Sequence, residues 1–131
     1  MSDAQNYCPD LEPADAEKVN RAARAIQTGD AEGAEGLLME VVRNCPREYV
    51  YEYKENGTLF VKFWDRDEFV HFVLWQKKQG TNQAVTWIPS AYPRAFFYLG
   101  FLHVKAHHPE QAIALLDRGQ SMEPANPKFR L

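Results

Sequence analysis

Apolar residues in the first third of the chain follow the period of a helix. Between Ala16 and Thr28 they recur every three or four residues, and Asp15 is placed to cap the start of this run. Gly29 interrupts the pattern, which then resumes from Ala31 to Asn44 and stops just before Pro46. Residues 14–47 are therefore predicted to form a helical hairpin with a short turn.

The pattern changes between Tyr49 and Trp64, where aromatic and β-branched residues are frequent. Asn56-Gly57 lies at the centre of this stretch and tolerates the positive φ angles of a type I′ turn, so a β-hairpin is predicted. Such a turn sets Tyr53 opposite Phe60 and Tyr49 opposite Trp64. Both faces of the hairpin carry large apolar groups, so we expect one to pack on helices and the other to be partly covered.

A helix from about Arg66 to Lys78 follows the hairpin, although the composition of this stretch also fits a strand. Asp65 followed three residues later by Glu68 is typical of a capping box, and it favours the helix. The residues expected together on one face of this helix are Phe69, Phe72, Val73 and Gln76. Ala84–Ile88 is a short strand candidate that ends before a proline and adds a third strand to the hairpin.

Two further helices are predicted near the end of the chain. Ser90 is placed to cap a helix from Ala91 to about Ala106, with Pro93 tolerated in its first turn. The last helix runs from Pro109 to about Met122. The expected fold class is mainly α (α+β). Two helical hairpins, at 14–47 and 91–127, are separated by an inserted β-hairpin or small antiparallel sheet at 48–90. All of these belong to one domain, 14–131, which follows a flexible arm at 1–13.

Small and apolar residues recur at fixed intervals from Phe96 onward. Leu99-Gly100 follows at three and four residues, a small residue lies twelve after the glycine, a large apolar residue four later, and a proline eight after that. This spacing resembles the tetratricopeptide repeat, in which the glycine lets two helices approach closely and the proline ends the second one. The positions are Phe96, Leu99, Gly100, Ala112, Leu116 and Pro124.

The first helical hairpin carries a weaker copy of the same pattern at Ala22, Ala34, Leu38 and Pro46. Its first helix lacks large aromatic residues, and the two copies together cover about half of the chain. Two repeats alone rarely bury enough surface, so we expect aromatic residues of the insert to complete the core. The family pattern usually continues into a further helix after the second copy.

The resemblance implies a non-enzymatic protein–protein interaction module, such as an adaptor, co-chaperone or assembly factor. The family usually binds peptides on a concave face lined by the first helix of each repeat, and the insert can either fill or extend that groove. By spacing, this face comprises Asn20, Ala23, Gln27, Arg94, Phe97, Phe101 and Lys105. Arg94 and Lys105 are the only candidates for the paired cations with which the family clamps a terminal carboxylate.

Composition sets few further limits on function. The net charge is -3 at pH 7, which gives no electrostatic attraction to nucleic acid or to anionic membranes. The sequence has no apolar run that could span a bilayer and no secretory signal, so a cytoplasmic location is the default expectation. Cys8 and Cys45 match neither a disulfide framework nor a zinc motif and are expected to be free thiols.

His103 and His107 are four residues apart, which is a spacing used for metal ligands. However, His103 occupies a packing position of the repeat pattern, while His107 and His108 fall in a turn, so we expect structural or solvent-exposed roles and no metal or cofactor. Signatures of catalysis, such as a glycine-rich phosphate loop or a nucleophile motif, are absent from the sequence, and no enzyme activity is predicted.

Two alternative functions stay open at this level. The exposed face of the aromatic hairpin could stack single-stranded bases, as in a nucleic-acid-binding or toxin-neutralising regulator, although its balanced charges disfavour nucleic acid. A homo-oligomeric structural protein could instead pair through the edges of the sheet. In either case the acidic cluster at Asp65, Asp67 and Glu68 is interpreted as a helix start and not as a magnesium site.

Overall fold

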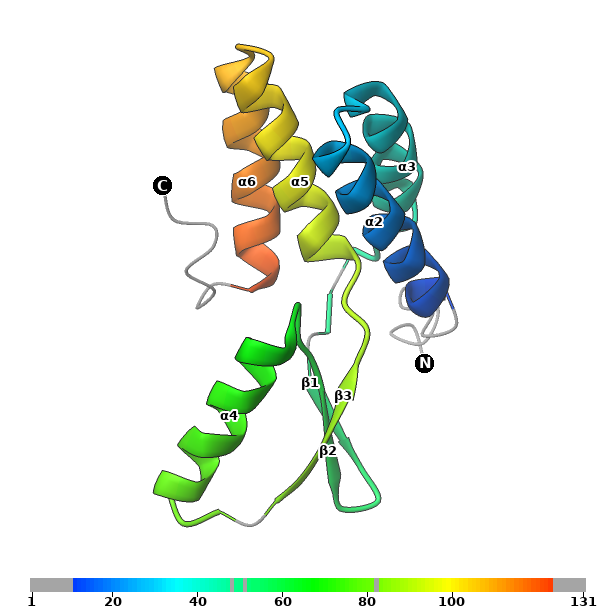
Figure 1. Ribbon diagram of the computed structural model, residues 1–131. Coiled ribbons are helices and arrows are strands. Elements are labelled where there is room, and N and C mark those ends of the chain that lie inside the picture. Colours follow the sequence, from blue (N-terminus) through cyan, green and yellow to red (C-terminus); the bar gives the residue numbers. More distant parts are fainter. Residues whose placement is uncertain (1–10, 48, 51, 82, 124–131) are drawn as a thin grey trace. The chain divides into compact units, whose positions relative to one another are not determined.

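The computed structural model describes residues 11–123 except for 48, 51 and 82. It is mainly helical with a small three-stranded sheet, which confirms the predicted fold class (Figure 1). The chain divides into two compact units, one built from the residues up to Tyr49 and from Ala91 onward, the other from Val50 to Ser90. Within the described residues, no helix has the length and apolar character needed to cross a membrane.

The first unit, here called the helical unit, consists of two helical hairpins. They are built from α2 (Leu11–Gln27), α3 (Ala31–Arg43), α5 (Tyr92–Lys105) and α6 (Pro109–Met122). α2 packs against α3 and α5 packs against α6, while α5 also contacts both α3 and α2 (Figure 1). The second hairpin is therefore joined to the first mainly through α5.

The core of the helical unit contains the residues singled out by the repeat pattern. Ala22, Ala34, Leu38 and Leu99 are fully buried, and the other described positions of the pattern are buried as well. Gly100 lies against Leu116, and a Cβ atom added at this glycine would be 2.7 Å from the Leu116 Cγ and Cδ2 atoms. The predicted close approach of the two helices is thus confirmed, whereas Pro124 lies outside the described residues.

The start of α2 differs from the prediction. The sequence suggested an arm through Pro13 and a cap at Asp15, but α2 already begins at Leu11. Asp15 is buried inside the helical unit, where its carboxylate accepts hydrogen bonds from the Tyr92 hydroxyl (2.8 Å) and from Asn44 Nδ2 (3.2 Å). The residue is therefore a buried hydrogen-bond acceptor and not a helix cap.

The start of α5 also differs from the prediction: Ser90 does not cap it, and a second buried carboxylate, Glu12, lies there. The N-cap of α5 is Ala91, and no side chain of its own caps this end. Instead, Glu12 Oε2 accepts a hydrogen bond from the Ala91 backbone N–H (2.9 Å) and another from the Tyr49 hydroxyl (2.9 Å). An acceptor distant in sequence thus satisfies a backbone donor at the start of α5.

Cys45 is a half-buried free thiol next to the end of α3. Burial raises the pKa of this thiol to about 11, and the nearby Arg118 guanidinium, with Nη2 4.0 Å from Sγ, only partly opposes that rise. Cys8, the other predicted free thiol, lies outside the described residues.

The second unit, here called the sheet unit, holds three strands and α4 (Arg66–Lys78). The strands are β1 (Glu52–Glu55), β2 (Thr58–Lys62) and β3 (Ala84–Ile88), in the spatial order β1-β2-β3. β1 is antiparallel to β2, but β3 is parallel to β2, so the expectation of an antiparallel sheet was wrong for the third strand. The reason is that α4 connects β2 to β3 and returns the chain to the same end of the sheet.

The predicted hairpin between β1 and β2 is confirmed. Asn56 and Gly57 have φ angles of 53° and 79°, as a type I′ turn requires, and Tyr53 lies opposite Phe60 with the two rings stacked at 5.1 Å. Tyr49 does not belong to β1, so its predicted pairing with Trp64 was wrong. The Tyr49 ring instead meets the Tyr92 ring edge-on, with centroids 6.1 Å apart.

α4 begins as the capping pattern predicts. Asp65 accepts a hydrogen bond from the Glu68 N–H (3.0 Å), and the Glu68 side chain accepts one from the Trp64 N–H (2.8 Å). Leu59, Val61 and Phe63 form the small core of the sheet unit. The face predicted for α4 turns toward this core: Phe69 and Phe72 pack against it, Gln76 is buried and Val73 is partly buried.

Candidate functional site

The residues assigned to the binding face lie on two helices that contact each other. We call this surface the α2/α5 face. It comprises Asn20, Ala23 and Gln27 of α2 together with Arg94, Phe97, Phe101 and Lys105 of α5. The Arg94 guanidinium donates a hydrogen bond to Asn20 Oδ1 and so joins the two helices at one end of the face.

Arg94 has a structural place in this arrangement. Only 9% of its surface is exposed, and burial lowers the pKa of its guanidinium from the usual value. Because the guanidinium is nearly buried and already donates to Asn20, it is poorly placed to bind a ligand carboxylate. Of the two cations proposed as a carboxylate clamp, only Lys105 is exposed to solvent.

The accessible part of the α2/α5 face lies toward the end of α5. Phe101 is 40% exposed, and Lys105 Nζ lies 5.5 Å from the centre of its ring. Phe97, one turn earlier, is half-buried and meets the Tyr98 ring edge-on with centroids 5.6 Å apart. An exposed aromatic ring next to a cation can contact an apolar side chain and a carboxylate at the same time.

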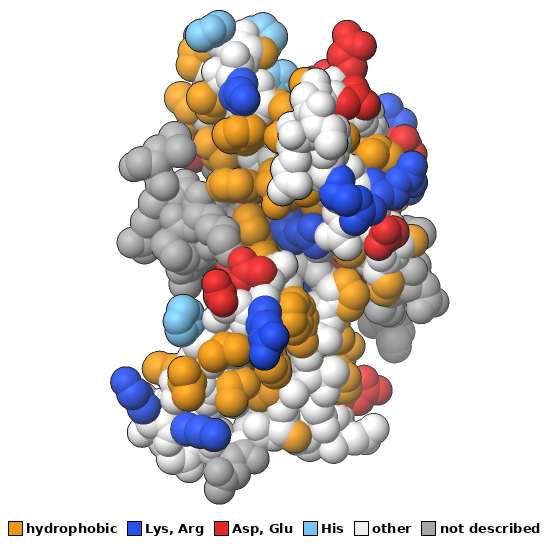
Figure 2. Space-filling view, viewed as in Figure 1, with side chains coloured by type: hydrophobic (Ala, Val, Ile, Leu, Met, Phe, Trp, Pro, Cys, Tyr) orange, Lys and Arg blue, Asp and Glu red, His pale blue; other side chains and the backbone are white. Residues whose placement is uncertain are grey.

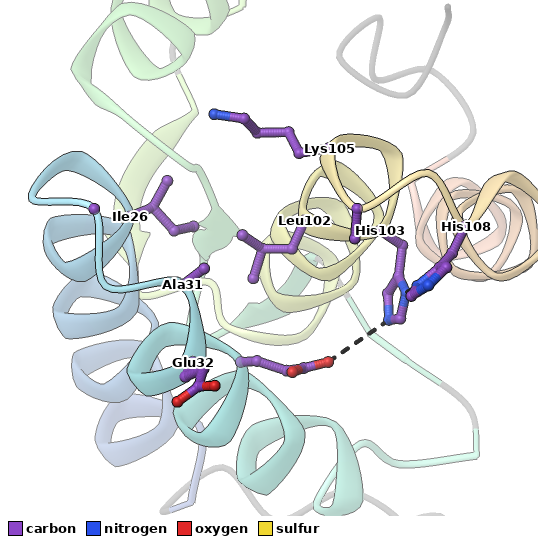
Figure 3. A pocket seen from close by; sticks show the side chains of 10 residues that line it. Ile26, Ala31, Glu32, Leu102, His103, Lys105 and His108 are labelled. Atoms are coloured by element: carbon purple, nitrogen blue, oxygen red, sulfur yellow. Dashed lines mark hydrogen bonds and ion pairs between the residues drawn. The ribbon is translucent and has the colours of Figure 1, made fainter.

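A pocket of about 420 Å³ adjoins this end of the face, and we call it the end pocket. It lies between the α2–α3 turn and the α5–α6 turn, and Lys105 belongs to its lining (Figure 3). Figure 3 shows Leu102 directed toward Ile26 across the pocket. The lining residues are Ile26, Gly29, Ala31, Glu32, Glu35, Leu102, His103, Lys105, Ala106 and His108.

One wall of the end pocket carries an ionisable group from each of three segments. Glu35 Oε2 of α3 lies 3.8 Å from His103 Nε2 of α5, and His103 Nδ1 lies 3.3 Å from Nδ1 of His108, which precedes α6 (Figure 3). One of the two Nδ1 atoms must carry the proton for this contact to be a hydrogen bond. Across residues 11–123, apart from 48, 51 and 82, no group of three or more His, Cys, Asp or Glu side chains could hold a metal ion.

Sequence reasoning identified Lys105 but missed most of the end pocket. Glu32 and Glu35 are exposed charged residues on a helix, and nothing in the sequence around them indicates a binding site. They join the histidines only because two turns, about eighty residues apart in the chain, lie at the same end of the helical unit. His107 was expected in the turn and lies there, with a φ angle of 64°.

Comparison with known proteins gives no further guide to the site: no protein-family model, curated protein or solved structure matches this chain.

Proposed function

We propose that this chain is a non-enzymatic protein–protein interaction module that binds a peptide segment of another protein along the α2/α5 face. The proposal is supported by burial at the described positions of the repeat pattern and by the tight contact of Gly100 with Leu116. The observation that carries it is the position of Lys105, which lies beside the exposed ring of Phe101 and also lines the end pocket. One side chain thus connects an aromatic surface to an adjoining cavity.

The chemistry of this surface defines the kind of peptide that fits it. The ring of Phe101 offers contact to an apolar side chain, and the neighbouring Lys105 favours a carboxylate next to it. Beyond the lysine, the end pocket combines an apolar floor with the carboxylates of Glu32 and Glu35, which favour a basic side chain. The partner segment is therefore expected to present an apolar anchor with an acidic group on one side and a basic group on the other.

The experiment that tests the proposal compares capture of partners from native lysate by three proteins: the natural chain, a Phe101→Ser/Lys105→Glu variant, and an Ile113→Ser control. Ile113 is a suitable control because it is 54% exposed but lies on α6, away from the α2/α5 face. A peptide from the captured partner is then titrated calorimetrically. Loss of an anchor residue typically weakens binding by about thirtyfold. Equal capture and equal affinity for all three proteins would contradict the proposal.

A further inference from the structure

The apolar side chains of α4 in the sheet unit are not confined to the side that faces the sheet. Phe69 and Phe72 face the sheet and pack on its core. Val70, Leu74 and Trp75 point elsewhere and are 40%, 51% and 56% exposed. A solvated helix normally carries polar residues on its outer side, so this outer side has the composition of a contact surface.

Charges of opposite sign flank the exposed apolar residues. Asp67 lies in the first turn of α4, and Lys77 and Lys78 lie in its last turn. Figure 2 shows acidic side chains next to a basic one near the upper end of the helix labelled α4 in Figure 1, hydrophobic ones in the middle and basic ones at its lower end. Because helical residues seven or eleven apart share a side, Asp67, Leu74 and Lys78 form one continuous stripe.

This stripe is complementary to itself in the antiparallel direction. When a second α4 is laid on the first with its direction reversed and its midpoint between Phe72 and Val73, Asp67 of each helix faces Lys78 of the other. In the same register His71 faces Leu74 in the centre, while Val70 and Trp75 lie on the two flanks of the contact, each on the same side as its own copy. Both ends therefore pair opposite charges, with Leu74 between them and the apolar Val70 and Trp75 at the flanks. Antiparallel helices also place opposite dipole ends together, which favours this direction.

We propose that α4 is a self-association surface, through which a second copy of this chain binds in an antiparallel, two-fold symmetric arrangement. A two-fold contact uses the same surface on both partners, and the order of acid, apolar group and base along α4 meets that requirement. The proposal concerns the sheet unit and is independent of peptide binding by the helical unit. It also differs from pairing through the edges of the sheet, because no strand takes part.

The size of the stripe sets the expected strength of the dimer. A single helix of 13 residues offers less area than the roughly 800 Å² per partner of a standard stable interface. A weak dimer is therefore expected, with a dissociation constant in the micromolar range. Trp75 is its expected anchor, because it is more exposed than Val70 and Leu74. Its ring also contacts the Phe72 ring, with centroids 6.1 Å apart.

The test measures the mass of the full chain by analytical ultracentrifugation, from about 5 to 500 µM protein, a range that spans a micromolar equilibrium. The natural chain should pass from monomer to dimer, Leu74→Glu should abolish the dimer, and Ile113→Glu, a similarly exposed site on α6, should leave it intact. A natural chain that stays monomeric throughout overturns the proposal. So does a dimer that Leu74→Glu leaves unchanged, because it would use another surface.

Charge reversal then tests the antiparallel register. In a dimer of the Asp67→Lys variant, two lysines meet at each end of the contact, and in a dimer of the Lys78→Glu variant, an aspartate meets a glutamate at each end. Each single variant should therefore associate about tenfold more weakly than the natural chain. An equimolar mixture of these two variants should recover the natural affinity, because in the mixed dimer the introduced lysine faces the introduced glutamate, and the natural Asp67 faces the natural Lys78. Circular dichroism of each variant confirms that α4 is intact. A mixture that associates no better than its components overturns the antiparallel register.

Discussion

Gly100 lies directly against the side chain of Leu116, so closely that a methyl group in place of its hydrogen would be 2.7 Å from two carbon atoms of the leucine. This contact joins α5 to α6, and the backbone oxygen of Ala112 lies 3.5 Å from the same point. The spacing of these residues in the sequence therefore corresponds to one tight helix crossing in the structure.

Replacing Gly100 with Leu should destabilise the helical unit. Overpacking of a core typically lowers the free energy of unfolding by about 1–3 kcal/mol. Here the introduced side chain would meet Leu116 at once and has no free volume to enter. Gly36→Leu is the matched control, because Gly36 also lies in a helix but has nothing within 4 Å of the position that a Cβ atom would occupy. Urea denaturation of both variants measures the effect, and equal free energies of unfolding would show that the contact is unimportant.

Tyr92→Phe should also lower stability, although it removes only one oxygen atom. The hydroxyl of this buried tyrosine donates to the Asp15 carboxylate, and a buried acceptor that loses its donor costs about 1–3 kcal/mol. Tyr98→Phe, on the half-buried side of the same helix, provides the control and should change the free energy of unfolding by much less. Chemical denaturation followed by circular dichroism distinguishes the two; a Tyr92 variant as stable as the control would contradict the role given to this hydrogen bond.

Cys45 should react slowly with thiol reagents in the folded protein. Its pKa is raised to about 11, so at pH 8 the reactive thiolate is about a hundredfold scarcer than for a thiol of ordinary pKa. The rate of alkylation, measured in a Cys8→Ser background, should rise steadily between pH 8 and pH 11. Urea-unfolded protein supplies the reference rate. Equal rates in the folded and unfolded protein at pH 8 would show that burial does not protect this thiol.

Replacing Asn56-Gly57 with Ala-Ala should loosen the sheet unit and leave the helices in place. Both residues have positive φ angles, which cost an alanine on the order of 1 kcal/mol each. The stacked rings of Tyr53 and Phe60 should then separate, so near-ultraviolet circular dichroism should weaken more than the helical signal. Glu55→Ala, an exposed substitution beside the turn, should leave both spectra unchanged. If the double variant has the same spectra and the same melting curve as the natural chain, the tight turn at Asn56-Gly57 is contradicted.

Features that depend on neighbours in sequence were predictable from the sequence alone. The bounds of α6, the cap at Asp65 and the turn at Asn56-Gly57 all follow from local rules about periodicity, side-chain acceptors and positive φ angles. Gly100 was also recognisable, because its partners recur at fixed distances along the chain. In each of these cases the physical cause lies within one turn, one hairpin or one repeat.

Features that depend on distant partners were not predictable in this way. An aspartate near the start of a helix has the sequence pattern of a cap. Only the folded structure, in which the Tyr92 hydroxyl donates to Asp15, shows that this residue is a buried acceptor. The end pocket is similar, since its carboxylates and histidines come from separate hairpins. The direction of β3 depends on where α4 returns the chain, which the alternation of its residues does not reveal.

The hydrogen bonds that converge on Glu12 have a consequence for how this chain can vary. The residues immediately before and after the sheet unit, Tyr49 and Ala91, both donate to the same oxygen of this carboxylate. The helical unit therefore fixes both ends of the inserted segment by itself. Since doubling the length of a loop adds only about 0.6 kcal/mol to its closure entropy, these fixed ends would tolerate segments of other lengths. Evolution or protein engineering could thus exchange Val50–Ser90 as a cassette while the surrounding helices keep their packing.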